Sequence, residues 1–443
     1  MSKSKLPPGP SSNPLAKTYN TLKYVNSHLH MLDDLREAYG DPFSFPALNG
    51  TVVLTGRPEY LKALYSANPN IFGIFAPEAI KPLLGAGSIF LLHGSSHRRE
   101  RKLLKPPFHG KRMKTYASAI KEATLHHLNA FPHDTPLSML EVMQDVAFEL
   151  IIRIVFGISD RDKVQTSQQV LSDYLNAISP LFIFVKALQN NFGGVGPYAE
   201  FQKHSKRLEA LLTEQINVLR TRPEAGDDIL SMMLLATHED GTHMSDSEII
   251  DEVKSLLIAG HETTATSLSW ALDDLHHHPD VLEKLLTELD VASDTPVDQI
   301  AKLPWLDAVC KETLRIHPIV SDFPRLLLEP LEFVDYTLPA GVAVSGCMHL
   351  THTDPEIFPE PFQYNPQRFI DRHYSPFEYH PFGGGHRRCI GFALAKFEMR
   401  IVLATALQNF TFSPLGPRDV ITRRNATLGP ERGVEMTFSP RTS

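Results

Sequence analysis

The sequence predicts a single, mainly α-helical domain that also contains small β-sheets. First, 42% of the 443 residues are hydrophobic, which is enough for one large core. Second, helical hydrophobic patterns recur along the chain, and the longest begins at a capping box at Ser245 and continues to Pro279. Third, no stretch has the composition of a long disordered linker. We therefore expect residues 1–443 to form one domain, with an extended, proline-rich segment at residues 1–14.

The charge and the cysteine content exclude several classes of protein. A formal net charge of −8 argues against nucleic-acid binding, which usually requires a basic surface. Three cysteines, Cys310, Cys347 and Cys389, are too few for a disulfide framework and indicate a reducing compartment. The N-terminus has no apolar run that predicts a signal peptide or a membrane anchor. We expect a cytoplasmic protein, and a monomer.

The N-terminal part of the chain predicts a small sheet followed by a shaped loop. A short amphipathic helical pattern at residues 32–39 ends at Gly40. Residues 43–54 predict two strands joined through Asn49-Gly50, a favoured hairpin turn. Residues 71–92 mix aromatic and aliphatic side chains with prolines and glycines, which is typical of a long loop that faces a ligand.

Residues 97–105 are strongly basic. His97 and Arg101 lie one helical turn apart, so both can face one anion. On the residues alone, a solvated basic face is the favoured interpretation. Further along, residues 179–197 combine an apolar run with glycines, which fits either a mobile lid over an apolar pocket or an ordinary helix end.

The pattern that starts at Ser245 predicts one helix of about 30 residues, roughly 45 Å long. Such a helix must cross the body of the domain. In its middle, Ala259-Gly260 removes side-chain bulk, and Glu262 and Thr263 place an acid and a hydroxyl among apolar neighbours. An interior glycine costs about 1 kcal/mol relative to alanine, and a buried carboxylate costs more unless it is partnered. Such local conflicts are expected at functional sites.

A shorter helix after Pro304 carries Glu312 and Arg315 on one face and should end before Pro318. Alone, this pair predicts only a surface contact worth a few tenths of a kcal/mol. Strand patterns at residues 331–333 and 342–344 flank a turn, and Arg368 lies in an aromatic, proline-punctuated loop at residues 361–369.

The loop at residues 382–391 has three consecutive glycines, Gly383 to Gly385, followed by Cys389. Glycines allow the backbone to approach a flat ligand closely. An apolar helical pattern begins at Phe392, so Cys389 should lie at a helix N-terminus, where the backbone dipole lowers a thiol pKa. We interpret Cys389 as a metal-binding thiolate, with the metal and any redox use left open by the loop itself.

Together these motifs resemble the cytochrome P-450 family. In chain order they are the acid–alcohol pair at 262–263, Glu-x-x-Arg at 312–315, Pro-x-Arg-Phe at 366–369 and Phe-x-x-Gly-x-Arg-x-Cys-x-Gly at 382–391. Glu-x-x-Arg alone is a weak signal, whereas the cysteine loop is a strong one. The resemblance extends from about Leu6 to the end of the chain and implies a haem-thiolate monooxygenase with the P-450 fold.

The resemblance implies a role for each matching residue. Cys389 corresponds to the axial ligand of the haem iron, and Phe382 to the residue beside its sulfur. The haem b would be held without covalent attachment, since no Cys-x-x-Cys-His motif is present. Ala259 and Gly260 correspond to cofactor-contacting positions. The positions that bind the haem propionates are matched by His97, Arg101, Arg325 and Arg387, so the basic helix is now expected to bind an anion.

The remaining motif residues divide into a catalytic and a structural set. Glu262 and Thr263 resemble the family's proton-delivery pair, which a monooxygenase needs because water leaves the bound dioxygen. Their presence does not exclude a variant driven by peroxide. Glu312, Arg315 and Arg368 resemble a buried ion-pair network that organises the cysteine loop.

The resemblance also implies partners. No flavin or ferredoxin module follows the cysteine loop, so electrons from NAD(P)H are expected through a separate ferredoxin or flavodoxin and its reductase. A basic docking patch is predicted at five positions, namely Lys102, Lys105, Lys111, Arg112 and Lys114. The alternative function is a non-catalytic haem-thiolate sensor of gas or redox state.

The pocket is expected to be apolar, which favours a terpenoid, a steroid or a fatty acid as substrate. Its candidate lining residues are Phe90, Leu256, Ile319, Val320, Phe323 and Leu428. Asp322, next to Phe323, is the odd residue in this otherwise apolar set. We expect it to face the surface, with a pocket-facing carboxylate as the alternative.

Overall fold

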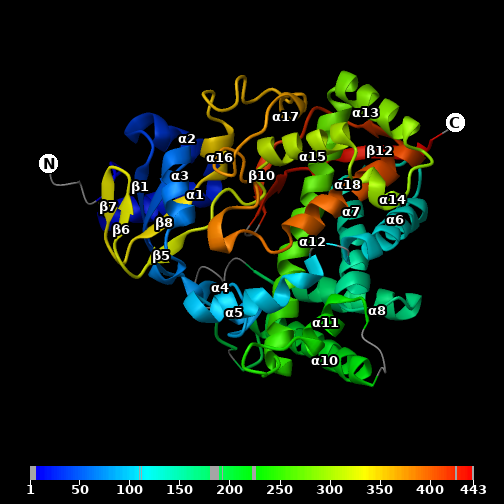
Figure 1. Cartoon of the computed structure of the whole chain (residues 1–443), viewed down its shortest axis with the longest axis horizontal. Coiled ribbons are helices and arrows are strands. Elements are labelled where there is room, and N and C mark those ends of the chain that lie inside the picture. Colours follow the sequence, from blue (N-terminus) through cyan, green and yellow to red (C-terminus); the bar gives the residue numbers. More distant parts are fainter. Residues whose placement is uncertain are drawn as a thin grey trace.

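The computed structural model describes residues 6–108, 110, 112–179, 189–191, 193–221, 226–424 and 427–441. It confirms a single, mainly α-helical domain with small sheets. Figure 1 shows the largest sheet with α1, α2 and α3 at one end of the molecule and the helices α6, α7, α12, α15 and α18 at the other.

The largest sheet is built from strands of both halves of the chain. Its order is β1-β2-β8-β5-β3, with β2 parallel to β8 and the other pairs antiparallel. The strands are β1 (Phe43–Ala47), β2 (Gly50–Thr55), β3 (Phe72–Ile74), β5 (Arg325–Leu327) and β8 (Ala343–Gly346). The predicted hairpin is confirmed, since Ala47 pairs with Gly50 across the turn. Strand β5 of this sheet places Arg325 within hydrogen-bond distance of the cysteine loop.

Three smaller sheets complete the β structure. The first joins β4 (Leu137–Ser138), β12 (Glu435–Pro440) and β9 (Phe410–Pro414). The second pairs β6 (Leu331–Phe333) with β7 (Tyr336–Leu338), and the third pairs β10 (Ile421–Arg424) with β11 (Thr427–Pro430).

The N-terminal helices differ from the prediction. Helix α1 (Pro14–Asn26), capped by the Asn13 side chain, was not predicted, and α2 (His28–Tyr39) begins before residue 32. Residues 71–92 were predicted to be a loop, which is wrong for much of their length. They contain β3 and α4 (Pro77–Leu84), because Pro77 favours a helix start and residues 72–74 pair with β5.

The central element is α12 (Asp246–His276), a helix of 31 residues that starts with the predicted capping box at Ser245 and Glu248. It packs against α7 (Met139–Leu150), α15 (Pro304–Ile316) and α18 (Phe392–Asn409). These elements share one large apolar core. A π-helical turn, η3 (Ile151–Val155), continues α7.

The other helical segments surround this core. They are α3 (Pro58–Ser66), η1 (Pro69–Ile71), α5 (Gly94–Leu104), η2 (Pro106–Phe108), α6 (Arg112–Ala130), α8 (Arg161–Asn176), α10 (Pro197–Arg220), α11 (Ile229–Leu235), α13 (Pro279–Val291), α14 (Val297–Ile300), α16 (Met348–His352), α17 (Arg368–Asp371) and η5 (Gly385–Arg387).

Among the described residues, no helix has the length and apolar character needed to cross a membrane. Most of the apolar run in the predicted lid, residues 180–188, lies outside the described residues, as does Lys111 of the predicted docking patch.

Candidate haem-binding site

The cysteine loop lies between His380 and the start of α18 and is closed by its own backbone. The Cys389 N–H donates to the Phe382 carbonyl at 3.0 Å, and the Arg388 N–H donates to Gly385 at 3.2 Å. Cys389 stands three residues before Phe392, the first residue of α18, with Gly391 as the cap residue. The sequence prediction of a cysteine beside a helix N-terminus is confirmed.

The glycine run makes its close approach to Tyr65 of α3. A Cβ built at Gly384 would lie 2.2 Å from the Tyr65 ring, and one at Gly385 would lie 2.6 Å from the Tyr65 carbonyl oxygen. Gly385 also has a φ of +63°, which side-chain-bearing residues rarely adopt. The protein's own packing therefore requires glycine at these two positions, whatever the ligand.

The expected lowering of the Cys389 thiol pKa is wrong for the polypeptide alone. Cys389 is exposed to solvent, yet desolvation by the surrounding protein raises its thiol pKa, although the Gly391 N–H and the charges of Arg101 and Arg388 act in the opposite direction. A thiol that coordinates a metal ion is deprotonated by the ion itself. Desolvation by the protein and deprotonation by a metal are thus separate effects at this sulfur.

Four cationic candidates gather beside this loop without an acidic partner among the described residues. They come from separate elements: His97 and Arg101 from α5, Arg325 from β5 and Arg387 from η5. Two of them hold loop carbonyls, since Arg325 Nη2 donates to Gly384 at 2.7 Å and Arg101 Nη2 donates to Arg388 at 2.5 Å. Arg387 Nη1 donates to the Ile89 carbonyl at 3.0 Å.

Burial and mutual repulsion destabilise the charged forms of this cluster. Burial, with the charges of Arg387 and Arg101, lowers the pKa of His97 to about 3. Burial lowers the pKa of Arg325 to about 10, and burial with neighbouring arginines lowers that of Arg387 to about 10. Arg325 Nη1 is buried and has no hydrogen-bond partner. The cluster is therefore built to receive negative charge.

Residues in the middle of α12 lie in two different environments. His261 is buried against α7, where its ring lies 3.7 Å from that of Phe148. Its neighbours Gly260, Glu262 and Thr263 are only partly buried, although the helix crosses the core. A Cβ at Gly260 would meet only Ile151, at 3.9 Å, so protein packing does not require a glycine there.

The acid and the alcohol of α12 have different surroundings. Thr263 Oγ1 donates to the Ala259 carbonyl at 2.7 Å, one turn earlier. Burial raises the pKa of Glu262, while a hydrogen bond from Thr427 of β11 and the charge of Arg424 of β10 oppose the rise. The sheet β10-β11 thus supplies the polar partners of Glu262.

Glu312, Arg315 and Arg368 form a buried network. The Glu312 carboxylate accepts from Arg315 Nε at 2.7 Å and Nη2 at 2.8 Å, and from Arg368 Nε at 3.1 Å. Arg315 Nη1 also donates to the His352 carbonyl at 2.8 Å, and His352 Nε2 accepts from the His380 N–H at 3.1 Å. This sequence of hydrogen bonds connects the network to the residue two positions before Phe382.

The apolar candidates come together in two pairs. The Leu428 N–H donates to the Ile319 carbonyl at 2.8 Å, and the rings of Phe90 and Phe323 lie 6.3 Å apart. Phe90, Leu256 and Phe382 are partly buried and pack against the main core. Val320, next to Ile319, is also partly buried.

The prediction that Asp322 faces the surface is wrong. Its side chain is 2% exposed and accepts from Tyr24 Oη of α1 at 3.0 Å and from Ser321 Oγ at 2.9 Å. His28 Nε2 lies 3.5 Å away. Burial acts to raise the pKa of Asp322, but these partners, His28 first, outweigh it and the pKa is lowered. The carboxylate anchors α1 and α2 to the loop after α15.

The predicted basic patch is largely paired with acids. Lys102 contacts Glu239 at 2.5 Å, Lys114 contacts Asp298 at 3.4 Å, and Arg112 pairs with Asp227. Lys105 is exposed. The two remaining cysteines are buried, as predicted.

Comparison with known proteins identifies the family. The family model described as Cytochrome P450 matches residues 7–438. The chain belongs to the cytochrome P450 family. Two proteins of Mycobacterium tuberculosis, named "Putative cytochrome P450 135B1" and "Putative cytochrome P450 138", are 34% and 33% identical to it. The first alignment covers 97% of this chain and 91% of the relative, and the second covers 89% and 88%.

A solved structure titled "Retinoic acid bound cyanobacterial CYP120A1" superposes with a TM-score of 0.87 at 23% identity, covering 99% of this chain and 100% of that chain. At this identity the likeness shows the P450 fold. The family is one of haem-thiolate monooxygenases, which use haem, O₂ and electrons from a partner. The predicted family and fold are both confirmed.

The residues present fit a haem. Its two propionates are anions that match Arg101, Arg325 and Arg387, which have no acidic partner among the described residues, with His97 beside them as a neutral imidazole. The buried Arg325 Nη1, which has no hydrogen-bond partner, supplies a free donor. Cys389 supplies a soft sulfur ligand suited to iron, and the apolar side chains of Phe382 and Leu394 lie on either side of it in sequence.

Sequence reasoning missed several residues of this region. His386 adjoins the cation cluster, and burial with the charges of Arg325 and Arg387 lowers its pKa to about 3. Its position in the sequence, between Gly385 and Arg387, could have indicated that it lies beside this cluster. Tyr65 gave no such signal, because it acts through a contact between elements remote in sequence.

Proposed function

We propose that this P450 inserts one oxygen atom of O₂ into an unactivated C–H bond of an apolar small molecule. The balanced reaction is RH + O₂ + 2e⁻ + 2H⁺ → ROH + H₂O, with the electrons supplied by NAD(P)H through a separate ferredoxin or flavodoxin and its reductase. Haem, when bound, supplies the activation of dioxygen. The observation that carries the proposal is the unpaired cation cluster beside Cys389 in a chain of this family.

Each proposed role rests on a contact described above. His97, Arg101, Arg325 and Arg387 would neutralise the propionates, and Cys389 would hold the iron. Thr263 would present its hydroxyl to the oxygen-binding side, where its bond to the Ala259 carbonyl leaves the oxygen lone pairs able to accept. Glu262 would exchange protons with water, since burial raises its pKa toward neutral pH.

The substrate class is inferred from the candidate lining. Phe90, Leu256, Ile319, Phe323 and Leu428 are apolar, which favours a terpenoid, a steroid or a fatty acid. Asp322 does not add a polar contact to this list, because its carboxylate already accepts from Tyr24 and Ser321.

The test is turnover of lipid-like compounds with a surrogate ferredoxin and reductase under ¹⁸O₂. Candidate compounds are chosen first by the spectral shift that they cause in the oxidised haem protein. We expect a product that carries one ¹⁸O atom, formed only with NAD(P)H and both partner proteins. A haem protein that binds such compounds and is reduced, but forms no oxygenated product, would instead support the sensor function.

Partner docking is tested separately at Lys105, the exposed member of the basic patch. Lys105→Glu should slow ferredoxin-supported reduction, most strongly at low salt. Lys206→Glu, which changes another exposed lysine, on α10, is the matched control. Equal reduction rates for the two variants would place the docking surface elsewhere.

A further inference from the structure

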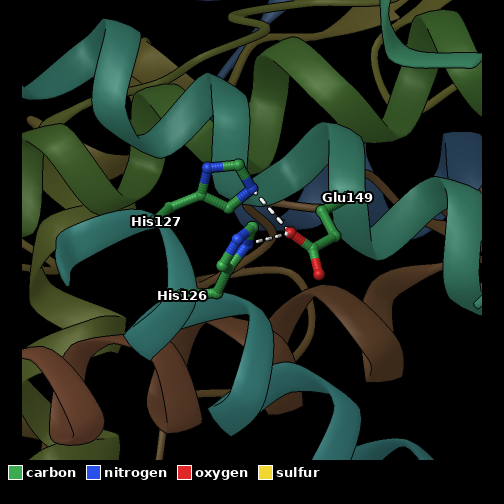
Figure 2. A group of neighbouring side chains, drawn as sticks. All are labelled: His126, His127 and Glu149. Carbon is green, nitrogen blue, oxygen red and sulfur yellow. Dashed lines mark hydrogen bonds and ion pairs between the residues drawn. The ribbon is translucent and has the colours of Figure 1, made fainter. Parts of the chain in front are cut away.

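A second group of potential metal ligands lies outside the haem region, between α6 and α7. It consists of His126 and His127 on α6 and Glu149 on α7, and we call it the His–carboxylate site. Its three donor atoms all lie within 4.8 Å of one another. Figure 2 shows both imidazole rings directed at the same carboxylate oxygen.

The donor distances are close to those of a metal centre. His126 Nδ1 lies 3.0 Å from Glu149 Oε2, and His127 Nε2 lies 2.8 Å from the same oxygen. Donors bonded to zinc at about 2.0–2.1 Å in tetrahedral geometry lie about 3.3 Å apart. If these donor atoms moved apart by a few tenths of an ångström, the ion would fit between them.

The surroundings hold the carboxylate in place and leave one side accessible. Arg153 Nη2 contacts Glu149 Oε1 at 2.5 Å, so the arginine fixes one oxygen and leaves Oε2 to the histidines. The side chain of Glu149 is 2% exposed and that of His127 is 12% exposed, whereas that of His126 is 49% exposed. An ion can thus reach the site past His126, and a water molecule can complete its coordination.

The Glu149 carboxylate is held deprotonated, as a metal ligand must be. Burial acts to raise the pKa of Glu149, but His127, His126 and Arg153 outweigh it and lower the pKa to about 2. Asp145, one helical turn before Glu149, interacts electrostatically with His127 and accepts from Gln168 at 2.9 Å. A third carboxylate, that of Glu122, lies 3.3 Å from Arg153 Nη1. His127 Nε2 is buried and lacks a hydrogen bond of good geometry.

We propose that the His–carboxylate site binds one zinc-class divalent ion, which joins α6 to α7. Two imidazole nitrogens and one carboxylate oxygen are borderline ligands of the kind that zinc prefers. Because α6 packs on α18 and α7 packs on α12, an ion here would stabilise the helical part of the protein without contacting Cys389.

The experiment is equilibrium dialysis of the haem-loaded protein against micromolar zinc chloride, with bound zinc measured by elemental mass spectrometry. The thiolate haem spectrum verifies that Cys389 is occupied by iron. We expect one zinc per chain, and at least a tenfold weaker affinity in His127→Gln and Glu149→Gln. His204→Gln is the matched control, because His204 also contacts carboxylates, Asp173 and Glu200, but as the single histidine there.

A second variant and a second readout keep the proposal testable if the buried substitutions disturb folding. His126→Gln changes the half-exposed ligand, and it should also lower zinc affinity while the haem spectrum stays intact. Zinc should raise the thermal unfolding midpoint of the unaltered protein and of His204→Gln, but not of His126→Gln. Equal zinc binding by the unaltered protein and His126→Gln, or no zinc retained by either, would overturn the proposal and leave a metal-free His–Glu contact.

Discussion

The substitution Glu312→Gln tests the buried ion-pair network most directly. In the native protein, the Glu312 carboxylate accepts from Arg315 at 2.7 and 2.8 Å, from Arg368 at 3.1 Å and from the Asn365 N–H at 2.8 Å. An amide has one acceptor oxygen in place of two and directs its NH₂ group at guanidinium donors. Two arginines would then remain buried without a negative partner.

The expected destabilisation is about 3–5 kcal/mol, the cost of removing one member of a buried ion pair. This corresponds to a change of about two to four orders of magnitude in the folding equilibrium, out of a total stability of about 5–15 kcal/mol. Because Arg315 also holds the His352 carbonyl, and His352 accepts from His380, the cysteine loop should be disturbed as well.

Two measurements check this prediction: the haem content of the purified variant and its urea unfolding. The matched control is Glu378→Gln, which makes the same chemical change in the partly exposed pair with Arg372 and should cost about 0–1 kcal/mol. If Glu312→Gln keeps full haem content and costs no more than Glu378→Gln, the network does not support the cysteine loop.

Three further predictions follow from the site. Cys389→Ser should fold but lose the thiolate spectrum of the CO-bound reduced haem; a retained thiolate spectrum would identify a different ligand. Thr263→Ala should lower product formation about 10²-fold or more while substrate binding persists, measured as product per NAD(P)H consumed; unchanged coupling would remove Thr263 from proton delivery. Asp322→Asn should lower stability at pH 7, since the lowered folded pKa of Asp322 contributes stability that is present above the unfolded value of about 3.9 and is lost as the pH falls through the folded value. Its urea midpoint should therefore differ from that of the unaltered protein at pH 7 and 5, and less at pH 3.5; a constant difference would contradict this.

Features fixed by local pattern could be predicted from the sequence. The capping box at Ser245 marks the start of α12, and the spacing around Cys389 identifies its loop. The charged residues Glu312, Arg315 and Arg368 were recognisable as a network only through the family resemblance, because on their own helix the first two look like a surface pair.

Features fixed by remote partners could not be predicted. Asp322 is buried because Tyr24, 298 residues away in sequence, and Ser321 supply its hydrogen bonds. Helix α1 was missed because three of its larger apolar side chains, Leu15, Tyr19 and Leu22, are exposed, so it lacks the continuous buried apolar face by which a surface helix is usually recognised. The close packing of Tyr65 on the glycine run likewise exists only in three dimensions.

The contact of Tyr65 with Gly384 and Gly385 also couples the local stability of two distant parts of the chain. Tyr65 belongs to α3, at the sheet-bearing end of the molecule in Figure 1, whereas the cysteine loop leads directly into α18 of the helical core. The closest packing of the loop is therefore against α3, and the two stabilise each other. Hydrogen exchange should accordingly show the amides of residues 382–389 opening together with those of α3, as one cooperative unit.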